Sequence, residues 1–202
     1  QRSVCCQEEN VVREYRADTV IYAGTAHRLG KMEIEGVPAE QLKLLADIVY
    51  PPVSSLTLGF DLSNIKHQLD GFGVLVPEVE KRQILGALFL STLFPERVPE
   101  GKASLTVFIG GTRQPENAVL PQTELIDLVM KDLRPMLGIS GDPDYVFHRY
   151  WEKAIPQYEP GYAKVRKRIQ ELETENPGLF FCGNYISGIS VADTLLHACR
   201  TT

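Results

Sequence analysis

The chain has 202 residues, of which 44% are hydrophobic and 23% are charged, and these proportions are ordinary for a globular protein. A formal net charge of −5 and a pI near 5.4 argue against the basic surface of a nucleic-acid-binding protein, so no nucleic-acid partner is expected. No run of about 18 apolar residues occurs, so the sequence predicts no membrane-spanning helix.

The first predicted elements are a β-hairpin and a separate strand within residues 2–24. A polar strand is expected to end near Cys6, with a turn at 8–10 and a returning strand over 11–15. Residues 17–24 have the sequence ADTVIYAG, an apolar run that closes on glycine. Such a run is typical of a strand that is covered on both faces of its sheet.

The middle of the chain is predicted to be rich in strands. A helix over 38–49 precedes it, with apolar residues at helical spacing, and the two prolines at 51 and 52 end that helix. Short links between the strands that follow indicate an antiparallel meander. The four predicted strands are 53–61, 73–77, 84–90 and 103–110.

The second half of the chain alternates between helices and strands. Gly138 follows an amphipathic stretch and fits a helix C-cap. An α/β pattern at both ends and an antiparallel group in the middle predict a discontinuous cofactor domain with an inserted antiparallel domain. The predicted elements are helix 122–137, strand 145–151, helix 162–173, strand 179–182 and helix 190–200.

The segment 178–193 is the most informative part of the sequence. It is predicted to form a buried strand, a turn punctuated by Gly183 and Gly188, and a helix that begins near Ser190. Glycine permits close backbone approach, and a helix N-terminus presents free N–H groups to an anionic ligand. A dinucleotide site normally also needs G-x-G-x-x-G after a first strand, and this chain has none. The chain, which starts at Gln1 without a leader, is therefore expected to be the back half of a cofactor enzyme.

The cysteines and histidines do not form a metal-binding or disulfide pattern, so no metal is assigned. A reduced, cytoplasmic chain with ordinary thiols is expected. His27 and His148 are not assigned as bases, because a lone histidine near a strand end is usually structural. The cysteines are Cys5, Cys6, Cys182 and Cys199.

Five sequence blocks, in order along the chain, resemble one family. They run from about Tyr15 to Arg200 and identify the chain as similar to the C-terminal half of FAD-dependent protoporphyrinogen/coproporphyrinogen oxidases, within the amine-oxidase-like flavoprotein superfamily. One block alone is weak, but five in the right order are specific. The blocks are GFGVLVP (71–77), ILGALF (84–89, leading to Phe94-Pro95), LTVFIGG (105–111), WEKAIPQY (151–158) and the closing segment with Gly183-Asn184-Tyr185.

The resemblance implies a flavoenzyme of haem and porphyrin biosynthesis that oxidises a porphyrinogen. Hydride passes to FAD and then to O2 or another acceptor, and the cofactor does the difficult step. The implied fold is α+β / α/β: an antiparallel-sheet substrate domain plus C-terminal pieces of a discontinuous Rossmann-like FAD domain. In this scheme 1–24 returns to the FAD domain, 25–150 is the substrate-binding domain with helices, and 151–202 completes the FAD domain.

The resemblance also implies site residues, although the catalytic residues stay unknown. One departure concerns FAD contacts, because Gly24-Thr25-Ala26-His27 stands where the family usually has a Thr-Pro step. The cofactor residues implied are Ile189, Ser190 and Val191 at the flavin pyrimidine end, Gly183 and Asn184 near the ribityl and phosphate groups, and Trp151 beside the flavin. The porphyrinogen cavity is implied to be lined by Phe72, Gly73, Leu75 and Phe108.

Several alternatives stay open at this point. The substrate is protoporphyrinogen or coproporphyrinogen, and peripheral membrane association and a homodimer are both compatible with the resemblance. Another amine-oxidase-like flavoprotein, amine-oxidising or phytoene-desaturase-like, shares the closing segment. A non-catalytic binding domain is the third hypothesis, and an upstream G-x-G-x-x-G in the full reading frame would argue against it.

Overall fold

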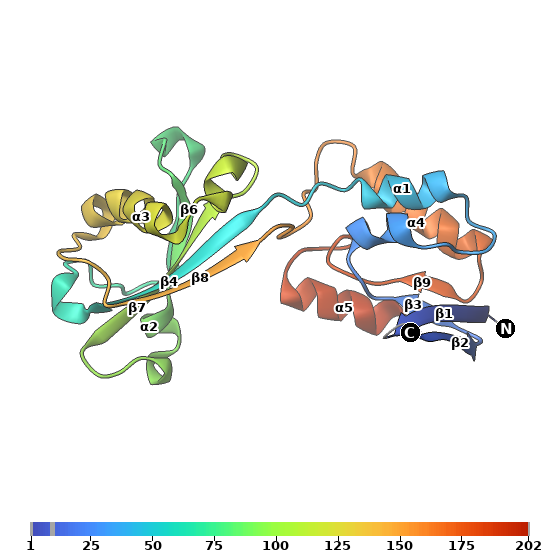
Figure 1. Cartoon of the computed structure of the whole chain (residues 1–202), viewed down its shortest axis with the longest axis horizontal. Coiled ribbons are helices and arrows are strands. Elements are labelled where there is room, and N and C mark those ends of the chain that lie inside the picture. The colour runs from blue at the N-terminus through green and yellow to red at the C-terminus, as the bar shows by residue number, and fades with distance from the viewer. Residues whose placement is uncertain (1, 9–10, 202) are drawn as a thin grey trace. The chain divides into compact units, whose positions relative to one another are not determined.

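A computed structural model describes residues 2–8 and 11–201, so most of the turn predicted at 8–10 lies outside the described residues. The chain forms two compact units (Figure 1). The terminal unit combines Gln1–Val49 with Ile155–Thr202, and the central unit is Tyr50–Ala154.

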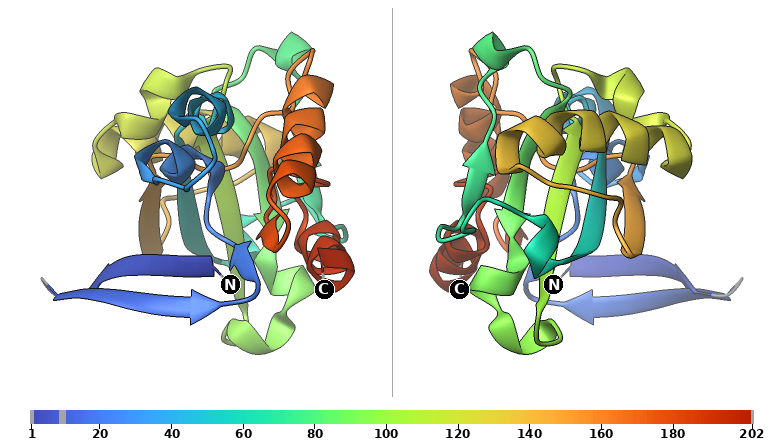
Figure 2. Two further views of the ribbon diagram at one scale, coloured as in Figure 1. Left: turned by 90° about the vertical axis from the view of Figure 1, so that its right-hand side faces the viewer. Right: turned by 90° about the vertical axis from the view of Figure 1, so that its left-hand side faces the viewer.

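The terminal unit contains two two-stranded sheets. Strands β1 and β2 pair antiparallel as the predicted hairpin, drawn as a two-stranded ribbon in Figure 2, and β3 pairs parallel with β9. The elements are β1 (Arg2–Glu8), β2 (Val11–Ala17), β3 (Val20–Tyr22), α1 (Ala39–Ala46), α4 (Ala163–Glu175), β9 (Leu179–Phe181) and α5 (Val191–Thr201).

The prediction for residues 17–24 differs from the structure. Only Val20–Tyr22 is strand, and Ile21 is 45% exposed, so this strand is not covered on both faces within the described chain. It has one partner, because β9 is the only strand that pairs with it among the described residues. An apolar run therefore marked a strand without revealing how much of it is covered.

The domain boundaries also lie elsewhere than 24/25 and 150/151. Residues 25–49 belong to the terminal unit, where α1 buries Leu42 and Leu45 and a short 3-10 helix, Ala26–Lys31, buries Ala26 and Leu29. These apolar side chains keep the segment with its own neighbours rather than with the central sheet. The second boundary lies at 154/155.

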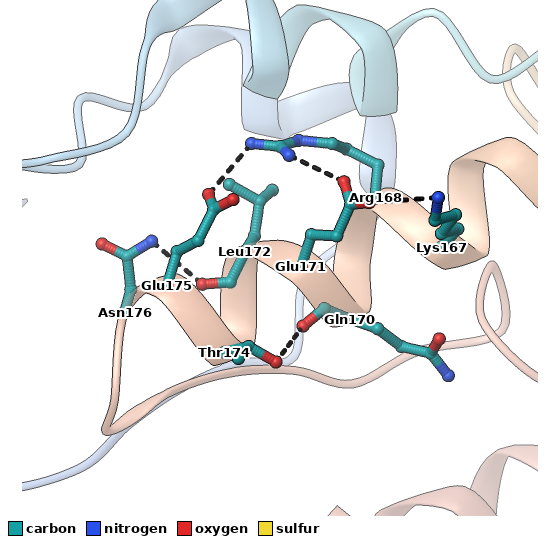
Figure 3. A network of polar contacts seen from close by, with 8 residues as sticks. All are labelled: Lys167, Arg168, Gln170, Glu171, Leu172, Thr174, Glu175 and Asn176. Atoms are coloured by element: carbon teal, nitrogen blue, oxygen red, sulfur yellow. Dashed lines mark hydrogen bonds and ion pairs between the residues drawn. The ribbon is translucent and has the colours of Figure 1, made fainter.

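Helix α4 carries an ion-pair network along one side (Figure 3). Arg168 lies 2.8 Å from a Glu171 oxygen and 3.2 Å from a Glu175 oxygen, and its side chain is only 17% exposed. The hydrogen bond from Arg168 is the main cause that lowers the pKa of the Glu171 carboxyl. Its two glutamates, three and seven residues further along the chain, hold the Arg168 side chain against the helix.

The central unit contains one five-stranded antiparallel sheet in the order β5-β6-β7-β4-β8. The predicted meander is correct for β5, β6 and β7, but β4 pairs with β7 and β8 instead of β5. The long link 62–72 allows the chain to pass two strands before it re-enters the sheet. The elements are β4 (Val53–Asp61), β5 (Gly73–Leu75), β6 (Ile84–Phe89), α2 (Leu90–Leu93), β7 (Lys102–Gly110), α3 (Gln122–Leu137) and β8 (Tyr145–Trp151).

One face of this sheet forms the hydrophobic core. Buried and partly exposed residues alternate along β4 and β7, as period-two strands require. Helix α3 crosses this face (Figure 2, right) and packs Leu125, Val129 and Leu133 into the same cluster as Leu56 and Leu105. The hydrophobic core therefore packs against one face of the sheet, and the second face is not part of this core.

Polar groups on this core side are satisfied by specific partners. Ser54 Oγ donates to the Ala118 carbonyl at 2.6 Å and lies 2.8 Å from His148 Nε2, so His148 has a structural partner. Asp132 accepts the backbone N–H groups of Gln83 and Ile84, which ties α3 to β6. Such pairing removes the penalty of burying these groups.

The start and end of the longer helices agree with the predictions to within two residues. Gly138 adopts a left-handed conformation with φ 63°, and its N–H bonds to the Arg134 carbonyl, so the predicted C-cap of α3 is confirmed. No helix within residues 2–8 and 11–201 has the length and apolar character to cross a membrane.

Candidate functional site: a hollow at the ends of two parallel strands

A hollow of about 700 Å³ lies in the terminal unit where β3 and β9 end. The two strands are in register from Val20↔Leu179 to Tyr22↔Phe181, so their carboxyl ends lie side by side. Ligands of open α/β sheets bind at this end of the strands. The lining residues are Ala23, Gly24, Thr25, His27, Arg28, Gly183, Asn184, Ile189, Val191, Thr194 and Leu195.

Glycine is required at two positions of the closing turn. A Cβ at Gly183 would stand 2.6 Å from the Tyr185 ring, and a Cβ at Gly188 would stand 2.5 Å from the Asp193 side chain. Real Cβ atoms do not approach other atoms so closely, and the Tyr185 side chain is fully buried. The turn therefore depends on the absence of both side chains, which confirms its predicted glycine chemistry.

Tyr158 holds the closing turn together. Its hydroxyl donates to the Asn184 carbonyl at 2.7 Å and accepts the Gly188 N–H at 3.0 Å. The ring stacks on Tyr162 with centroids 4.3 Å apart, and the Tyr162 hydroxyl donates to the Tyr185 carbonyl. Burial raises the pKa of the Tyr158 hydroxyl above its usual 10.0, although the hydrogen bond from Gly188 opposes the shift.

Helix α5 begins at the hollow with a side-chain cap. Ser190 Oγ accepts the Asp193 N–H at 3.0 Å and donates to Asp193 Oδ2 at 2.6 Å. The helix thus begins at Val191, one residue after the predicted start. Its first-turn N–H groups at Val191 and Ala192 have no partner within the helix and stand at its positive end. They are suited to an electron-rich group of a ligand.

The segment from Gly24 to Arg28, which follows β3, also lines the hollow. Thr25 Oγ1 lies 3.1 Å from His27 Nε2, and the Tyr22 hydroxyl donates to the Thr25 carbonyl at 2.8 Å. Arg28 adds a positive charge to the lining. This segment therefore presents a hydroxyl, an imidazole and a guanidinium at the hollow.

The second face of the central sheet, opposite the core, carries most of the other predicted residues. The register places Leu75, Gly86, Phe108, Ser55 and Arg149 in one row across the five strands. We call this surface the open face. Leu75 is 91% exposed. Phe108 is half-buried and is not a member of the core cluster.

A second row completes the open face. It contains Gly73, Leu88, Thr106, Thr57 and Phe147, and the Thr57 and Thr106 hydroxyls lie 3.0 Å apart. Trp151 lies on the same side of β8, two residues beyond Arg149. The surface is aromatic and apolar with a central strip of hydroxyl groups.

The predicted site residues thus separate into groups. Gly183, Asn184, Ile189 and Val191 line the hollow, and Ser190 caps the helix beside it. Gly73, Leu75, Phe108 and Trp151 share the open face, whereas Phe72 lies just outside β5 and is exposed. Trp151 belongs to the central unit and is not among the residues that line the hollow.

Other residues at the hollow were not predicted. Thr194 and Leu195 line it because they follow Ser190 and Val191 by one helical turn, a spacing that could have identified them. Tyr158 was seen only as part of a sequence block. Its role depends on a contact across 26 residues that no local pattern reveals.

The residues at the hollow fit a flavin nucleotide. The two turn glycines leave space that a Cβ would fill, and the first turn of α5 offers N–H groups to an anionic group. Within the described residues, no three His, Cys, Asp or Glu side chains gather as a metal site. The fold and the hollow therefore define part of a nucleotide-cofactor protein.

The comparison with protein families agrees with this geometry. Residues 2–202 match the family of flavin containing amine oxidoreductases, and the chain belongs to that family. Members of this family contain flavin, so FAD is the cofactor of the family to which the chain belongs.

Named relatives and solved structures are longer than this chain. It is 41% identical over 162 residues to a mitochondrial protoporphyrinogen oxidase of Nicotiana tabacum, covering 79% of this chain and 32% of that protein. It is 36% identical to protoporphyrinogen oxidase 2 of Arabidopsis thaliana, over 98% of this chain and 40% of that one. A coproporphyrinogen III oxidase of Bacillus subtilis is 24% identical, over 89% and 38% of the two chains.

The fold comparison gives the same architecture. A crystal structure from Exiguobacterium sp. 255-15 superposes with a TM-score of 0.78 at 17% identity, covering 98% of this chain and 42% of that one. Reduced UDP-galactopyranose mutase superposes with a TM-score of 0.67 at 18% identity, covering 87% and 38%. The predicted mixed fold, which combines an antiparallel sheet with part of a flavoprotein α/β domain, is confirmed.

Proposed function

We propose that the full-length protein is an FAD-dependent porphyrinogen oxidase of haem biosynthesis. The observation that carries the proposal is the 41% identity to a protoporphyrinogen oxidase, together with the glycine turn and helix start at the hollow. The higher identity to protoporphyrinogen oxidases than to a coproporphyrinogen III oxidase favours protoporphyrinogen as the substrate.

In this proposal the terminal unit holds FAD. Bound FAD supplies the hydride acceptor. Gly183 and Asn184 allow the backbone to approach the ribityl and phosphate groups. The N–H groups at Val191 and Ala192 stabilise negative charge at the pyrimidine end of the flavin. Tyr158 keeps the turn in the shape that these contacts need.

The open face of the central unit is proposed to hold the tetrapyrrole. Phe108 and Leu75 offer apolar area to the flat ring. Gly73 and Gly86 have no side chains, so the ring can approach the backbone of the sheet at these two positions. A contact between Trp151 and the flavin stays a prediction from the family resemblance. The residues act by positioning the substrate and excluding water, since no nucleophile–base pair is needed for hydride loss.

The proposal extends to the partners. O2 or another acceptor reoxidises the flavin. A homodimer, peripheral membrane association and a cytoplasmic location stay predictions, because the named relatives include mitochondrial, chloroplastic and bacterial proteins.

The test is the full-length protein itself. After purification it should show a flavin absorbance spectrum and oxidise protoporphyrinogen IX, with coproporphyrinogen III and a primary amine assayed in parallel. Turnover of the amine alone would move the protein to the amine-oxidising branch. A colourless protein without oxidase activity would support the non-catalytic alternative.

A further inference from the structure

The open face carries a single cation without a carboxylate partner among the described residues. Lys102 also lies on this face, but it pairs with Asp61 at 2.8 Å and with Asp144. Arg149 is exposed, and no described Asp or Glu oxygen lies within 4.0 Å of it. Its charge is therefore available to a ligand.

The position of Arg149 is fixed by its neighbours. The register places it opposite Ser55 on β4, and Ser55 is opposite Phe108 on β7. Its guanidinium lies 5.0 Å from the centroid of the Trp151 ring, a cation–π contact that orients the side chain along the face. Two strand spacings, about 9.6 Å, separate Phe108 from Arg149.

We propose that Arg149 binds a carboxylate side chain of the tetrapyrrole whose ring packs on Phe108 and Leu75. This inference rests on the proposed function. Tetrapyrroles of haem synthesis carry propionate carboxylates at the ring edge, whereas the ring itself is apolar. The row of the open face that ends at Arg149 has the matching division, with Leu75 on β5, Phe108 on β7 and the guanidinium on β8. Arginine suits this role because its planar fork binds carboxylates through two hydrogen bonds.

Binding measurements on the full-length flavoprotein separate charge from packing. Protoporphyrin IX and its dimethyl ester, which lacks both carboxylates, are titrated against the wild type and the Arg149→Met variant. We expect the variant to bind the acid roughly 10- to 100-fold more weakly and the ester equally well. Lys131→Met on α3, which packs against the opposite face, removes the same charge and should leave both affinities unchanged.

A second variant keeps the test valid if Arg149→Met is unstable. Arg149→Lys retains the charge without the fork and should keep part of the preference for the acid over the ester. Flavin content and melting temperature are recorded for each preparation. The KM for protoporphyrinogen should rise in Arg149→Met while flavin content stays at the wild-type level.

The outcomes distinguish the two proposals. Equal losses for acid and ester in Arg149→Met, or no loss for either, would reject the carboxylate contact while leaving the oxidase function in place. If Arg149→Met cannot be purified, the wild type and Arg149→Lys are compared instead. The carboxylate contact is rejected if each of these two proteins binds the acid no more tightly than the ester. A wild-type protein that neither binds nor oxidises any porphyrinogen would reject the proposed function, and the role of Arg149 with it.

Discussion

The central and terminal units differ in how completely they bury their own apolar surface. The central unit has a five-stranded sheet with one face closed by α3 and a continuous buried cluster. The terminal unit has two-stranded sheets, and α5 has no buried residue, with Val191 and Leu195 exposed. The central unit therefore has one continuous buried cluster over its sheet, whereas the terminal unit positions the hollow and the start of α5 with turn geometry and hydrogen bonds.

The two faces of β7 give the sharpest test of this difference. Leu105 points into the core and Phe108 into the open face. Leu105→Ala should lower the free energy of unfolding of the central unit by about 2–5 kcal/mol. Phe108→Ala should cost clearly less and raise the KM for porphyrinogen. Chemical denaturation of the full-length protein measures the two losses of stability, and steady-state kinetics measures the KM. Equal destabilisation by the two variants would show that Phe108 acts as a core residue.

The terminal unit should instead be sensitive at its turn. Gly183→Ala places a Cβ 2.6 Å from the buried Tyr185 ring, and overpacking of this kind costs about 1–3 kcal/mol. FAD affinity should fall roughly 5- to 150-fold while the central unit melts normally. Gly71→Ala is the control, since its Cβ meets nothing within 4 Å. Wild-type flavin content in Gly183→Ala would contradict the assignment of this turn to the FAD site.

A smaller effect is expected from the hydroxyl that fastens this turn. Tyr158→Phe removes hydrogen bonds to Asn184 and Gly188, each contributing about 0.5–1.5 kcal/mol. Flavin affinity should fall by less than in Gly183→Ala, as measured by fluorescence on dilution of the holoprotein. Tyr150→Phe, on a tyrosine of similar exposure, should have no effect. A loss of the same size in both variants would indicate a general effect of removing a surface hydroxyl.

The pH dependence of Tyr158 gives the smallest predicted effect. Its pKa in the folded state is raised above 10.0, so the folded protein holds this proton more tightly than the unfolded chain does. The stabilisation that the protonated Tyr158 hydroxyl contributes to the folded state is fully present below pH 10. It is lost as the pH rises through the folded-state pKa. The difference in flavin retention between wild type and Tyr158→Phe should therefore narrow above pH 10. A constant difference up to pH 12 would contradict this assignment.

The predictable part of the fold came from local signals. Alternation along Val53–Asp61 and helical spacing along Gln122–Leu137 gave both elements with the bounds seen in the structure. Strand order was not local: β4 pairs with β7 and β8, which depends on contacts far along the chain. The compact units divide the chain at 49/50 rather than at the predicted 24/25, and the apolar spacing in α1 could not indicate which unit the segment 25–49 packs against.

The candidate site divides in the same way. Gly183 and Gly188 were recognisable because glycine, the strand and the helix start are contiguous in sequence. The roles of Tyr158 and Arg149 were not recognisable, because each depends on residues brought near by the fold. The family resemblance supplied Phe108 and Leu75, and their register on one face makes their proposed shared role testable.

The ends of the central unit meet. Val53 on β4 is opposite Trp151 on β8, and the Ala154 N–H donates to the Pro51 carbonyl at 3.1 Å. A unit whose entry and exit points are neighbours can be exchanged as a cassette without stretching the chain that carries it. Transplanting Tyr50–Ala154 into another member of the family should then transfer substrate preference as one block, with the host retaining its own FAD-binding segments.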